Sequence, residues 1–209
     1  VLFQPDIRRG LERMGQTDQW MYRFFNKKRY NDTSLKGAWS SAIIAICDAA
    51  ERFSETKTGA LIVFERRERL GEIISTGTMV DAAPSAELIK NIFFKNSPLH
   101  DGAMIVRAGR VCAAGCVLPL SGNQSLSRDL GTRHRAGIGM SENSDAIVVI
   151  VSEETGIISM AKNGVLIRRL DRQNLFNLLQ EEIVPPAEDE EANISPLQKL
   201  LRKGGALNH

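Results

Sequence analysis

The stretch AIVVIVSEETGIISMAKNGVLIRR, residues 146–169, decides the fold class of this 209-residue chain. Three apolar runs within it are separated by the turn segments EETG and Asn163–Gly164. Asn-Gly between apolar runs is the strongest short signal for a two-residue β-hairpin, so neighbouring strands are expected to run antiparallel. The expected strands are Ala146–Ser152, Gly156–Lys162 and Val165–Arg169, and a helix is expected to follow at Arg172–Glu182.

Upstream of this stretch, predicted helices alternate with strands and a second hairpin. Apolar residues at three- and four-residue spacings predict a buried helix face, and Ser85 is a suitable N-cap. The expected elements are a helix at Leu35–Ser54, strands at Gly59–Glu65 and Leu70–Ser75, a turn at Asp81–Ser85, a helix at Ala86–Lys95, a hairpin of Ala103–Ala108 and Val111–Leu118 about a Gly109–Arg110 turn, and a short helix at Arg133–Met140. Hairpins of this kind argue against a purely parallel, doubly wound sheet. We therefore expect an α/β fold: a single mixed β-sheet domain with flanking helices.

Composition and charge restrict the class of protein and the partners that we expect. The hydrophobic fraction of 43% and the charged fraction of 25% are those of a globular protein. A net charge of +2 gives no sign of nucleic-acid binding through bulk charge, so no nucleic-acid partner is expected. The odd number of cysteines, placed within apolar stretches at Cys47, Cys112 and Cys116, favours small buried side chains in a reducing compartment over a metal or redox site.

The two ends of the chain differ from its middle. Residues 1–34 are basic and aromatic, which suits either a linker with a short helix or a juxtamembrane segment at a lipid interface. The chain begins at Val1 without a methionine, and we expect a preceding segment to have been removed. After Pro185 and Pro186 the sequence is acidic and then basic, so residues 185–209 are expected to form a flexible tail. The folded domain is expected to span residues 35–184.

The first candidate site segment is His100-Asp101-Gly102-Ala103, directly before a predicted strand. A glycine beside an aspartate lets backbone and carboxylate approach a ligand closely. The carboxylate could coordinate a hard divalent metal or accept a proton. The alternative is a turn in which Asp101 bonds only to local backbone N–H groups.

The second candidate segment is Gly131-Thr132-Arg133-His134-Arg135, at a predicted helix start. A helix N-terminus offers free N–H groups to an anion, and arginine forks bind phosphate through two hydrogen bonds. The alternative is a pair of surface arginines that form ion pairs with an acid such as Asp129. A third segment, Ser152–Gly156, holds two adjacent acids and by itself is more typical of a turn. No P-loop, Gly-x-Ser-x-Gly elbow or dinucleotide fingerprint is present.

The spacing of these motifs resembles the diadenylate cyclase family. DGA at residues 101–103 and GTRHRAG at residues 131–137 are similar to its two signature motifs. The similarity continues through TGALIVFER (58–66), STGTMVDA (75–82), FFKNSPLHDGAMIV (93–106) and VVIVSEETGIISMAKNG (148–164). The opening FQPDIRRGLERMG (3–15) resembles the membrane-anchored housekeeping subgroup, in which transmembrane helices precede it. That likeness implies the cytoplasmic domain of a membrane-anchored bacterial protein.

The resemblance implies a reaction in which two protomers, each holding one ATP, face each other in a transient homodimer. Each 3′-hydroxyl attacks the α-phosphate of the other ATP, which gives cyclic di-AMP and two pyrophosphates with the help of Mg²⁺ or Mn²⁺. A membrane-associated regulator and a sugar-phosphate mutase are possible protein partners by resemblance alone. Two alternatives remain open: a nucleotide-binding regulatory module that has lost the reaction, and a membrane-proximal adaptor that acts through its basic N-terminal segment.

The resemblance also assigns roles to residues of both motifs. Asp101 would hold metal and help to activate the 3′-hydroxyl, with His100 and Glu154 as further metal ligands. Gly102 and Ala103 would leave room for ribose and phosphate. The triphosphate would be held by Thr132, Arg133, His134 and Arg135, which would also stabilise charge on the attacked phosphate and the departing pyrophosphate. Gly131 and Ser152 would belong to the ATP-binding site. Val117, Leu118 and Pro119 would lie along adenine, although Val117 stands where relatives often carry an aromatic residue, which puts stacking there in doubt.

Overall fold

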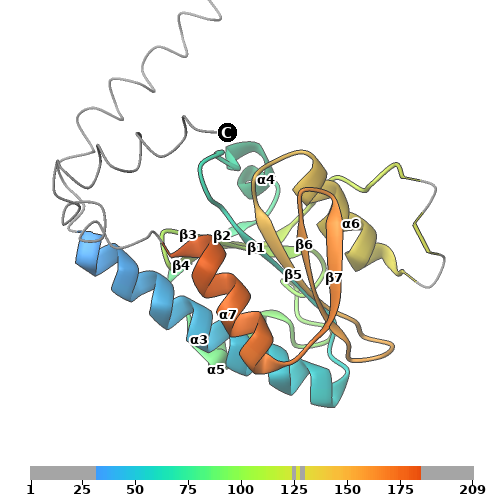
Figure 1. Ribbon diagram of the computed structural model, residues 1–209, viewed down its shortest axis with the longest axis horizontal. Coiled ribbons are helices and arrows are strands. Elements are labelled where there is room, and N and C mark those ends of the chain that lie inside the picture. The colour runs from blue at the N-terminus through green and yellow to red at the C-terminus, as the bar shows by residue number, and fades with distance from the viewer. Residues whose placement is uncertain (1–31, 124–125, 128–129, 185–209) are drawn as a thin grey trace, which may run out of the picture.

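The structure, a computed structural model, describes residues 32–123, 126–127 and 130–184. Within these residues one seven-stranded sheet lies between two layers of helices (Figure 1), which confirms the predicted single mixed sheet with flanking helices. The strands are β1 (Ala60–Phe64), β2 (Thr78–Ala82), β3 (Ala103–Arg107), β4 (Arg110–Cys116), β5 (Ile147–Val151), β6 (Ile158–Lys162) and β7 (Val165–Leu170). The helices are α3 (Asp32–Thr56), α4 (Gly71–Ser75), α5 (Ala86–Ile92), α6 (Thr132–Glu142) and α7 (Arg172–Ile183). The predictions for residues 1–31 and 185–209 lie outside the described residues.

The strand order is β2-β4-β3-β1-β5-β6-β7. The central pair, β1 and β3, is parallel, and every other neighbouring pair is antiparallel. The chain joins β6 to β7 through Asn163 and Gly164, whose φ angles of 50° and 75° are those that the predicted tight hairpin needs. The turn between β3 and β4 consists of Ala108 and Gly109, one residue earlier than expected.

Two apolar cores hold the layers together, one on each face of the sheet. Helices α3, α5 and α7 cover one face, where Ile43, Phe53 and Leu179 pack against strand residues such as Phe64. Helices α4 and α6 cover the other face, where Ile74 and Ile138 pack against Val63, Val148 and their neighbours. The central strands β1 and β5 are buried along their whole length, as a sheet covered on both faces requires.

The first half of the chain differs from the sequence prediction at two elements. The segment predicted as a strand at Leu70–Ser75 is the short helix α4, because Leu70 and Ile74, four residues apart, are both buried on one helical face. The expected turn at Asp81–Ser85 overlaps the edge strand β2, which the prediction missed because most of its residues are exposed and its pairing with β4 is irregular. Ser85 does cap α5, accepting a hydrogen bond from the Leu88 N–H.

All three cysteines are free and buried, as predicted. Burial raises the pKa of Cys47 to about 12 and that of Cys116 to about 11. Both thiols are therefore neutral at neutral pH and unsuited to act as nucleophiles.

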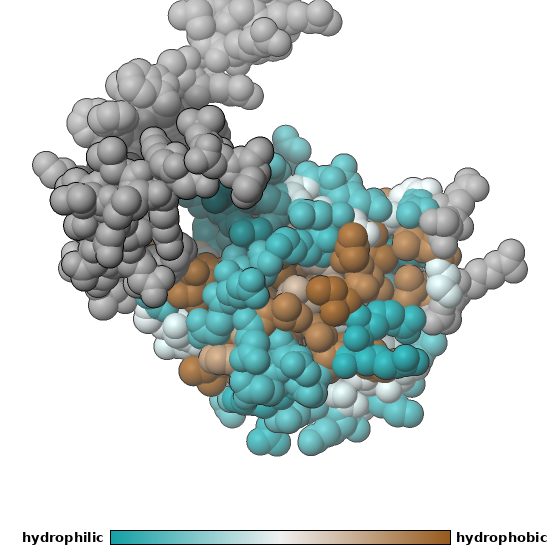
Figure 2. Space-filling model, in the orientation of Figure 1, coloured by the Kyte–Doolittle hydropathy of each residue, from teal (hydrophilic) through white to brown (hydrophobic). Residues whose placement is uncertain are grey.

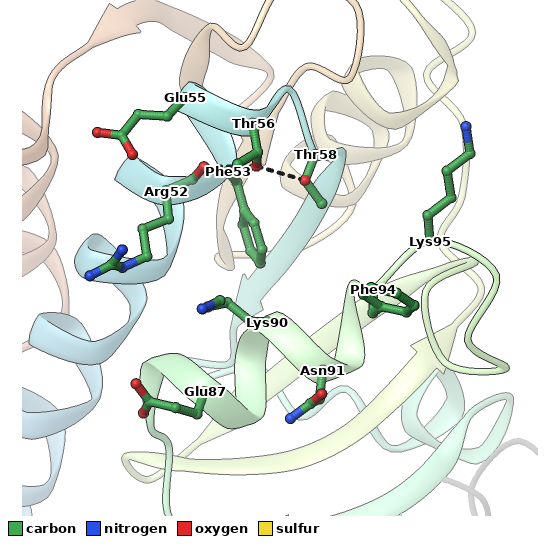
Figure 3. Close-up of a pocket in the computed structure, with 10 residues that line it drawn as sticks. All are labelled: Arg52, Phe53, Glu55, Thr56, Thr58, Glu87, Lys90, Asn91, Phe94 and Lys95. Atoms are coloured by element: carbon green, nitrogen blue, oxygen red, sulfur yellow. Dashed lines mark hydrogen bonds between the residues drawn. The ribbon is translucent and has the colours of Figure 1, made fainter.

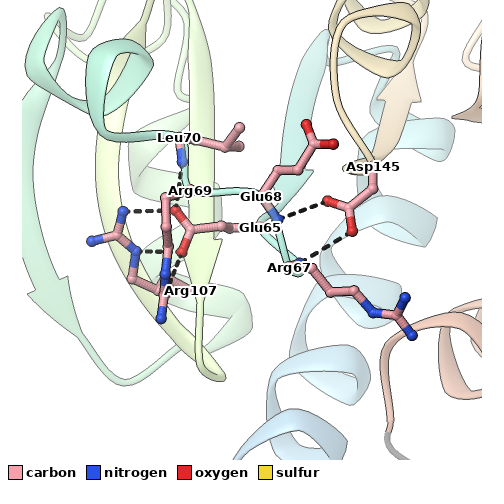
Figure 4. A network of polar contacts seen from close by, with 7 residues as sticks. All are labelled: Glu65, Arg67, Glu68, Arg69, Leu70, Arg107 and Asp145. Atoms are coloured by element: carbon pink, nitrogen blue, oxygen red, sulfur yellow. Dashed lines mark hydrogen bonds and ion pairs between the residues drawn. The ribbon is translucent and has the colours of Figure 1, made fainter. Parts of the chain in front are cut away.

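A network of polar contacts holds the end of β1 that lies away from the candidate site (Figure 4). Glu65, whose side chain is only 1% exposed, accepts two hydrogen bonds from Arg107 at 2.7 and 2.6 Å and one from Arg69 at 2.8 Å. It also accepts the Leu70 N–H. Burial alone would raise the pKa of Glu65, but the hydrogen bonds from Arg107, Leu70 and Arg69 lower it below its usual value. Beside this cluster, Asp145 accepts two further backbone N–H groups of the same loop.

On the face shown in Figure 2, hydrophilic residues surround a broad area of hydrophobic ones. The edge strand β7 exposes Val165 and Ile167. In the described ranges no helix has the length and apolar composition needed to cross a bilayer.

Candidate functional site

The candidate site lies at one end of the central strands, not beside an outer strand, and we call this end the site edge. The parallel strands β1 and β3 both begin there, while β4 and β5, which run the other way, both end there. The pairings Ala60↔Val151 and Ala103↔Cys116 fix this arrangement. Four short segments therefore come together from distant parts of the sequence: 58–59, 100–102, 116–118 and 152–154. Two of the three segments predicted from the sequence are among them.

The third predicted segment reaches the site edge through helix α6. The N-cap of α6 is Gly131, which has no side chain to bond the first N–H groups of the helix. Arg133, in the first turn, forms an ion pair with Glu153 at 2.7 Å between Nη1 and Oε2. The ion-pair alternative for this arginine is thus realised, with Glu153 as the partner. Asp129, the acid considered from sequence, lies outside the described residues.

The Arg133–Glu153 pair rests directly on the backbone of Gly59. A Cβ atom at Gly59 would lie 2.7 Å from Arg133 Nη1 and 3.0 Å from Glu153 Oε2, closer than real Cβ contacts. Glycine is therefore required for the position of the arginine. Sequence reasoning missed Gly59, and within the third candidate segment it gave a role to Glu154 rather than to Glu153. The sequence does contain a signal for Gly59. TGA (58–60) leads into β1 as DGA (101–103) leads into β3, and two parallel strands begin at the same end of a sheet.

Two hollows open on either side of this ion pair. The first, which we call the lysine cavity, has a volume of about 350 Å³ and is lined by Thr56, Lys57, Thr58, Gly59, Phe93, Lys95, His100, Arg133 and Glu153. The second, which we call the helix cavity, has a volume of about 170 Å³ and is lined by Gly131, Thr132, Arg133, His134, Val151, Ser152, Glu153 and Glu154. Since Arg133 and Glu153 line both hollows, a single elongated ligand could contact both.

The DGA segment shows why its glycine is needed. Gly102 has a φ of +125°, and a Cβ atom there would lie 2.7 Å from the Gly115 carbonyl carbon of β4. The glycine thus allows two backbones to approach each other at the start of β3. Asp101 before it is exposed, whereas Ala103 after it is fully buried in the core. A contribution of Ala103 to a ligand site could therefore come only from its backbone.

His100 is held in one orientation by a local hydrogen bond. Its Nδ1 lies 2.6 Å from the Ser97 carbonyl oxygen. A carbonyl can only accept, so Nδ1 carries the proton and donates it. In the neutral ring this leaves a lone pair on Nε2, which is the arrangement found in metal-ligating histidines. In the part of the chain that the structure describes, however, no three Asp, Glu, His or Cys side chains gather closely enough to form a metal site by themselves.

The remaining predicted residues differ in their access to the two hollows. Ser152 caps its turn by accepting the Thr155 N–H at 3.2 Å, so its hydroxyl proton stays available to a ligand. The exposed Val117 donates its N–H to Thr76 Oγ1 at 2.9 Å, while Leu118 is buried. His134 is only 4% exposed and lines the helix cavity. Arg135 lines neither hollow, because it lies about 200° around the helix from Arg133.

An α/β domain that gathers an uncapped helix N-terminus, an arginine and exposed carboxylates at one sheet edge has the features of a nucleotide-binding protein. A family model described as DAC, "DisA bacterial checkpoint controller nucleotide-binding", matches residues 47–166. Because that match covers more than half of the sequence, the chain belongs to the DAC family.

Several relatives are similar over most of the chain. "Cyclic di-AMP synthase CdaA" of Bacillus subtilis is 42% identical over 92% of this chain and 68% of its own length. A "Diadenylate cyclase" of Listeria monocytogenes serotype 1/2a is 38% identical over 88% of this chain and 64% of its own length. The chain thus spans about two thirds of the length of these curated relatives.

Solved structures show the same similarity in three dimensions. A double mutant of DacA from Staphylococcus aureus superimposes with a TM-score of 0.66 at 45% identity, covering 68% of this chain and 94% of that one. A hypothetical membrane-spanning protein from Bacillus cereus superimposes with a TM-score of 0.58 at 46% identity, covering 60% of this chain and 62% of that one.

Proposed function

We propose that this chain is the catalytic domain of a diadenylate cyclase, which condenses two ATP molecules into cyclic di-AMP and releases two pyrophosphates. The observation that carries the proposal is the position of Arg133. It lies at the uncapped start of α6, oriented by Glu153 over Gly59, on the same sheet edge as the exposed Asp101. Membership of the DAC family and relatives named for this product support the same reaction.

The stoichiometry of the reaction determines how the site would work. One protomer with one ATP has no second nucleotide to attack, so two copies would face each other about a two-fold axis. Each 3′-hydroxyl oxygen then bonds to the α-phosphorus of the other ATP. The bond from that phosphorus to the bridging oxygen breaks, and pyrophosphate leaves with the electron pair.

The residues of the site edge suit these steps. Asp101, whose side chain is exposed at the start of β3, would accept the proton of the 3′-hydroxyl. The N–H groups at the start of α6 and the guanidinium of Arg133 would stabilise charge on the attacked phosphate. The Ser152 hydroxyl, whose oxygen accepts the Thr155 N–H, can donate to a phosphate oxygen. The segment around Leu118 would lie along adenine.

A nucleotidyl transfer of this kind generally needs a divalent metal, and we propose Mg²⁺ or Mn²⁺. When bound, the ion would neutralise phosphate charge and lower the pKa of the attacking hydroxyl. The Asp101 carboxylate suits either ion, whereas the His100 Nε2 lone pair, oriented by Ser97, suits Mn²⁺ better than Mg²⁺, which prefers oxygen ligands. Mg²⁺ commonly takes only one or two protein carboxylates and completes its shell with water and substrate phosphates. Glu154, exposed at the same edge, is the proposed third ligand and would come from the facing protomer, because within one chain the described side chains do not gather closely enough for a three-ligand site.

We further propose that the full protein is anchored in a bacterial membrane by a segment N-terminal to this chain, with the domain on the cytoplasmic side. The similarity to a solved protein described as membrane-spanning and to CdaA supports anchoring. Regulatory protein partners are proposed only from the family resemblance.

The experiment is incubation of the purified chain with ATP and either metal, followed by mass spectrometry of the products. Cyclic di-AMP and pyrophosphate in a 1:2 ratio are expected. Asp101→Asn should abolish the product and leave the melting temperature unchanged, because the carboxylate is exposed but its charge is required. ATP binding without product would instead identify a regulatory module, and absence of ATP binding would favour the adaptor alternative.

A further inference from the structure

The lysine cavity carries more positive charge than its own acids neutralise. Its lining includes the cations Lys57, Lys95 and Arg133 and the titratable His100, but only one acid, Glu153. That acid already pairs with Arg133. Among the described residues, neither lysine makes an ion pair or a side-chain hydrogen bond. Two positively charged side chains of the lining are therefore without a partner in this part of the chain, and Arg133 of the proposed reaction site lines the same hollow.

The backbone at Lys57 forms the turn that ends helix α3. Its φ of 52° is in the left-handed region, which favours glycine and is uncommon for a lysine. The turn is braced on both sides. Thr56 donates its hydroxyl proton to the Arg52 carbonyl at 2.8 Å, so in the 2.8 Å contact between the two threonines Thr58 is the donor. The Thr58 N–H also bonds to the Phe53 carbonyl at 2.9 Å, so Lys57 occupies the left-handed position with which helices commonly end, and this turn fixes where its side chain begins.

Lys95 reaches the cavity from the other side. It follows α5 and also lines a neighbouring cavity of about 500 Å³ between α3 and α5. Figure 3 shows its side chain extending away from Lys90, Glu87 and Arg52, so it lies apart from the charged groups at the far end of that hollow. The lysines thus approach the lysine cavity from two different elements, the α3–β1 turn and the segment after α5.

We infer that the lysine cavity binds the β- and γ-phosphates of ATP, and the pyrophosphate they become, through Lys57 and Lys95. This rests on the proposed function. Most of the negative charge of ATP lies on these two phosphates, and it increases on the leaving group when the bond to the α-phosphorus breaks. Arg133 lines both hollows, so it can contact the α-phosphate while the lysines hold the departing group. Ammonium groups bind phosphate as point charges, whereas arginine forks hold it in a fixed bidentate geometry.

The test compares two nucleotides that cannot react because they lack the attacking hydroxyl: 3′-deoxy-ATP and 3′-deoxy-AMP. Calorimetric titration should show that Lys57→Gln and Lys95→Gln each weaken binding of 3′-deoxy-ATP by about five- to tenfold, the effect of one charge-assisted contact. Binding of 3′-deoxy-AMP should not change. A purely structural role would weaken both nucleotides equally. Lys90→Gln, in the neighbouring cavity, is the matched control and should bind both as the wild type does.

A second measurement uses the product itself. Added pyrophosphate should inhibit cyclic di-AMP synthesis, and its inhibition constant should rise by a similar factor in each lysine variant. If the wild type makes cyclic di-AMP but the variants keep its preference for 3′-deoxy-ATP and its pyrophosphate inhibition, the inference is wrong and the proposed function stands. If the wild type binds neither nucleotide and makes no product, both are wrong.

Discussion

Replacing Gly59 with alanine tests whether the position of Arg133 controls the reaction. The added methyl group would lie 2.7 Å from Arg133 Nη1 and 2.9 Å from its Cζ. Ordinary contact needs about 3.5 Å, so the guanidinium must withdraw by roughly 0.8 Å. A misplacement of about 1 Å at a reacting group can cost about a hundredfold in rate. We therefore expect Gly59→Ala to lower the rate of cyclic di-AMP formation by about ten- to a hundredfold.

Stability should respond much less than rate. The atoms that the methyl group meets are the ends of flexible side chains, and Gly59 does not adopt a positive φ. Gly→Ala at such a position restricts the unfolded chain and contributes about 0.4–1 kcal/mol, which offsets part of the crowding. The melting temperature should stay within about 4 °C of the wild type. Gly71→Ala, where a Cβ meets nothing within 4 Å, is the control for both assays. Full activity in a folded Gly59→Ala variant would refute the reasoning.

Three further predictions concern the arginines, the buried acid and assembly. Arg133→Ala should lower the rate of cyclic di-AMP synthesis by at least tenfold, and Arg133→Lys should restore it only in part. Arg135→Ala should lower the rate less, because Arg135 lines neither hollow. Equal losses of rate in a steady-state assay would contradict this difference. Glu65→Gln should destabilise the fold by about 2–4 kcal/mol at pH 7, because it leaves Arg107 facing a neutral amide. Since the pKa of Glu65 is lowered in the folded state, this stabilisation is present above about pH 4.3 and lost as pH falls further, so wild-type and variant melting temperatures should converge in acid. Specific activity should rise across a hundredfold range of enzyme concentration as dimers form; a constant value for a species that light scattering shows to be monomeric would exclude the facing-dimer mechanism.

The second half of the fold could be predicted closely from the sequence. Strand β5 is wholly apolar and buried, β6 is buried over most of its length, and Asn163–Gly164 alone determines the hairpin that joins β6 to β7. The first half was harder because its elements are short or exposed. Helix α4 has five residues, too few to distinguish a period of 3.6 from a period of 2. Strand β2 is an irregular edge strand whose side chains mostly face solvent, so it carries no alternating pattern.

The candidate site could be predicted only in part, for a related reason. The DGA and GTRHR motifs stand out because they place charged residues where no element needs them. Glycine and lysine residues such as Gly59 and Lys95 carry no such signal by themselves. Their roles depend on which strands are neighbours: Gly59 matters because β1 lies beside β5, which brings Glu153 over it. Strand order is a tertiary property that local pattern does not contain.

The two ends of β1 differ in whether nearby charged side chains have partners within the described chain. At the end away from the site, the carboxylate of Glu65 is buried and receives four hydrogen bonds from its own chain. At the site edge, Asp101 is exposed, and in the described region Lys57 and Lys95 have no acidic partner. Unpaired charge of both signs at one edge gives no stability to the isolated domain. It becomes favourable when a polyphosphate, a divalent cation and a second copy of the chain meet there, which is the assembly that cyclic di-AMP synthesis requires.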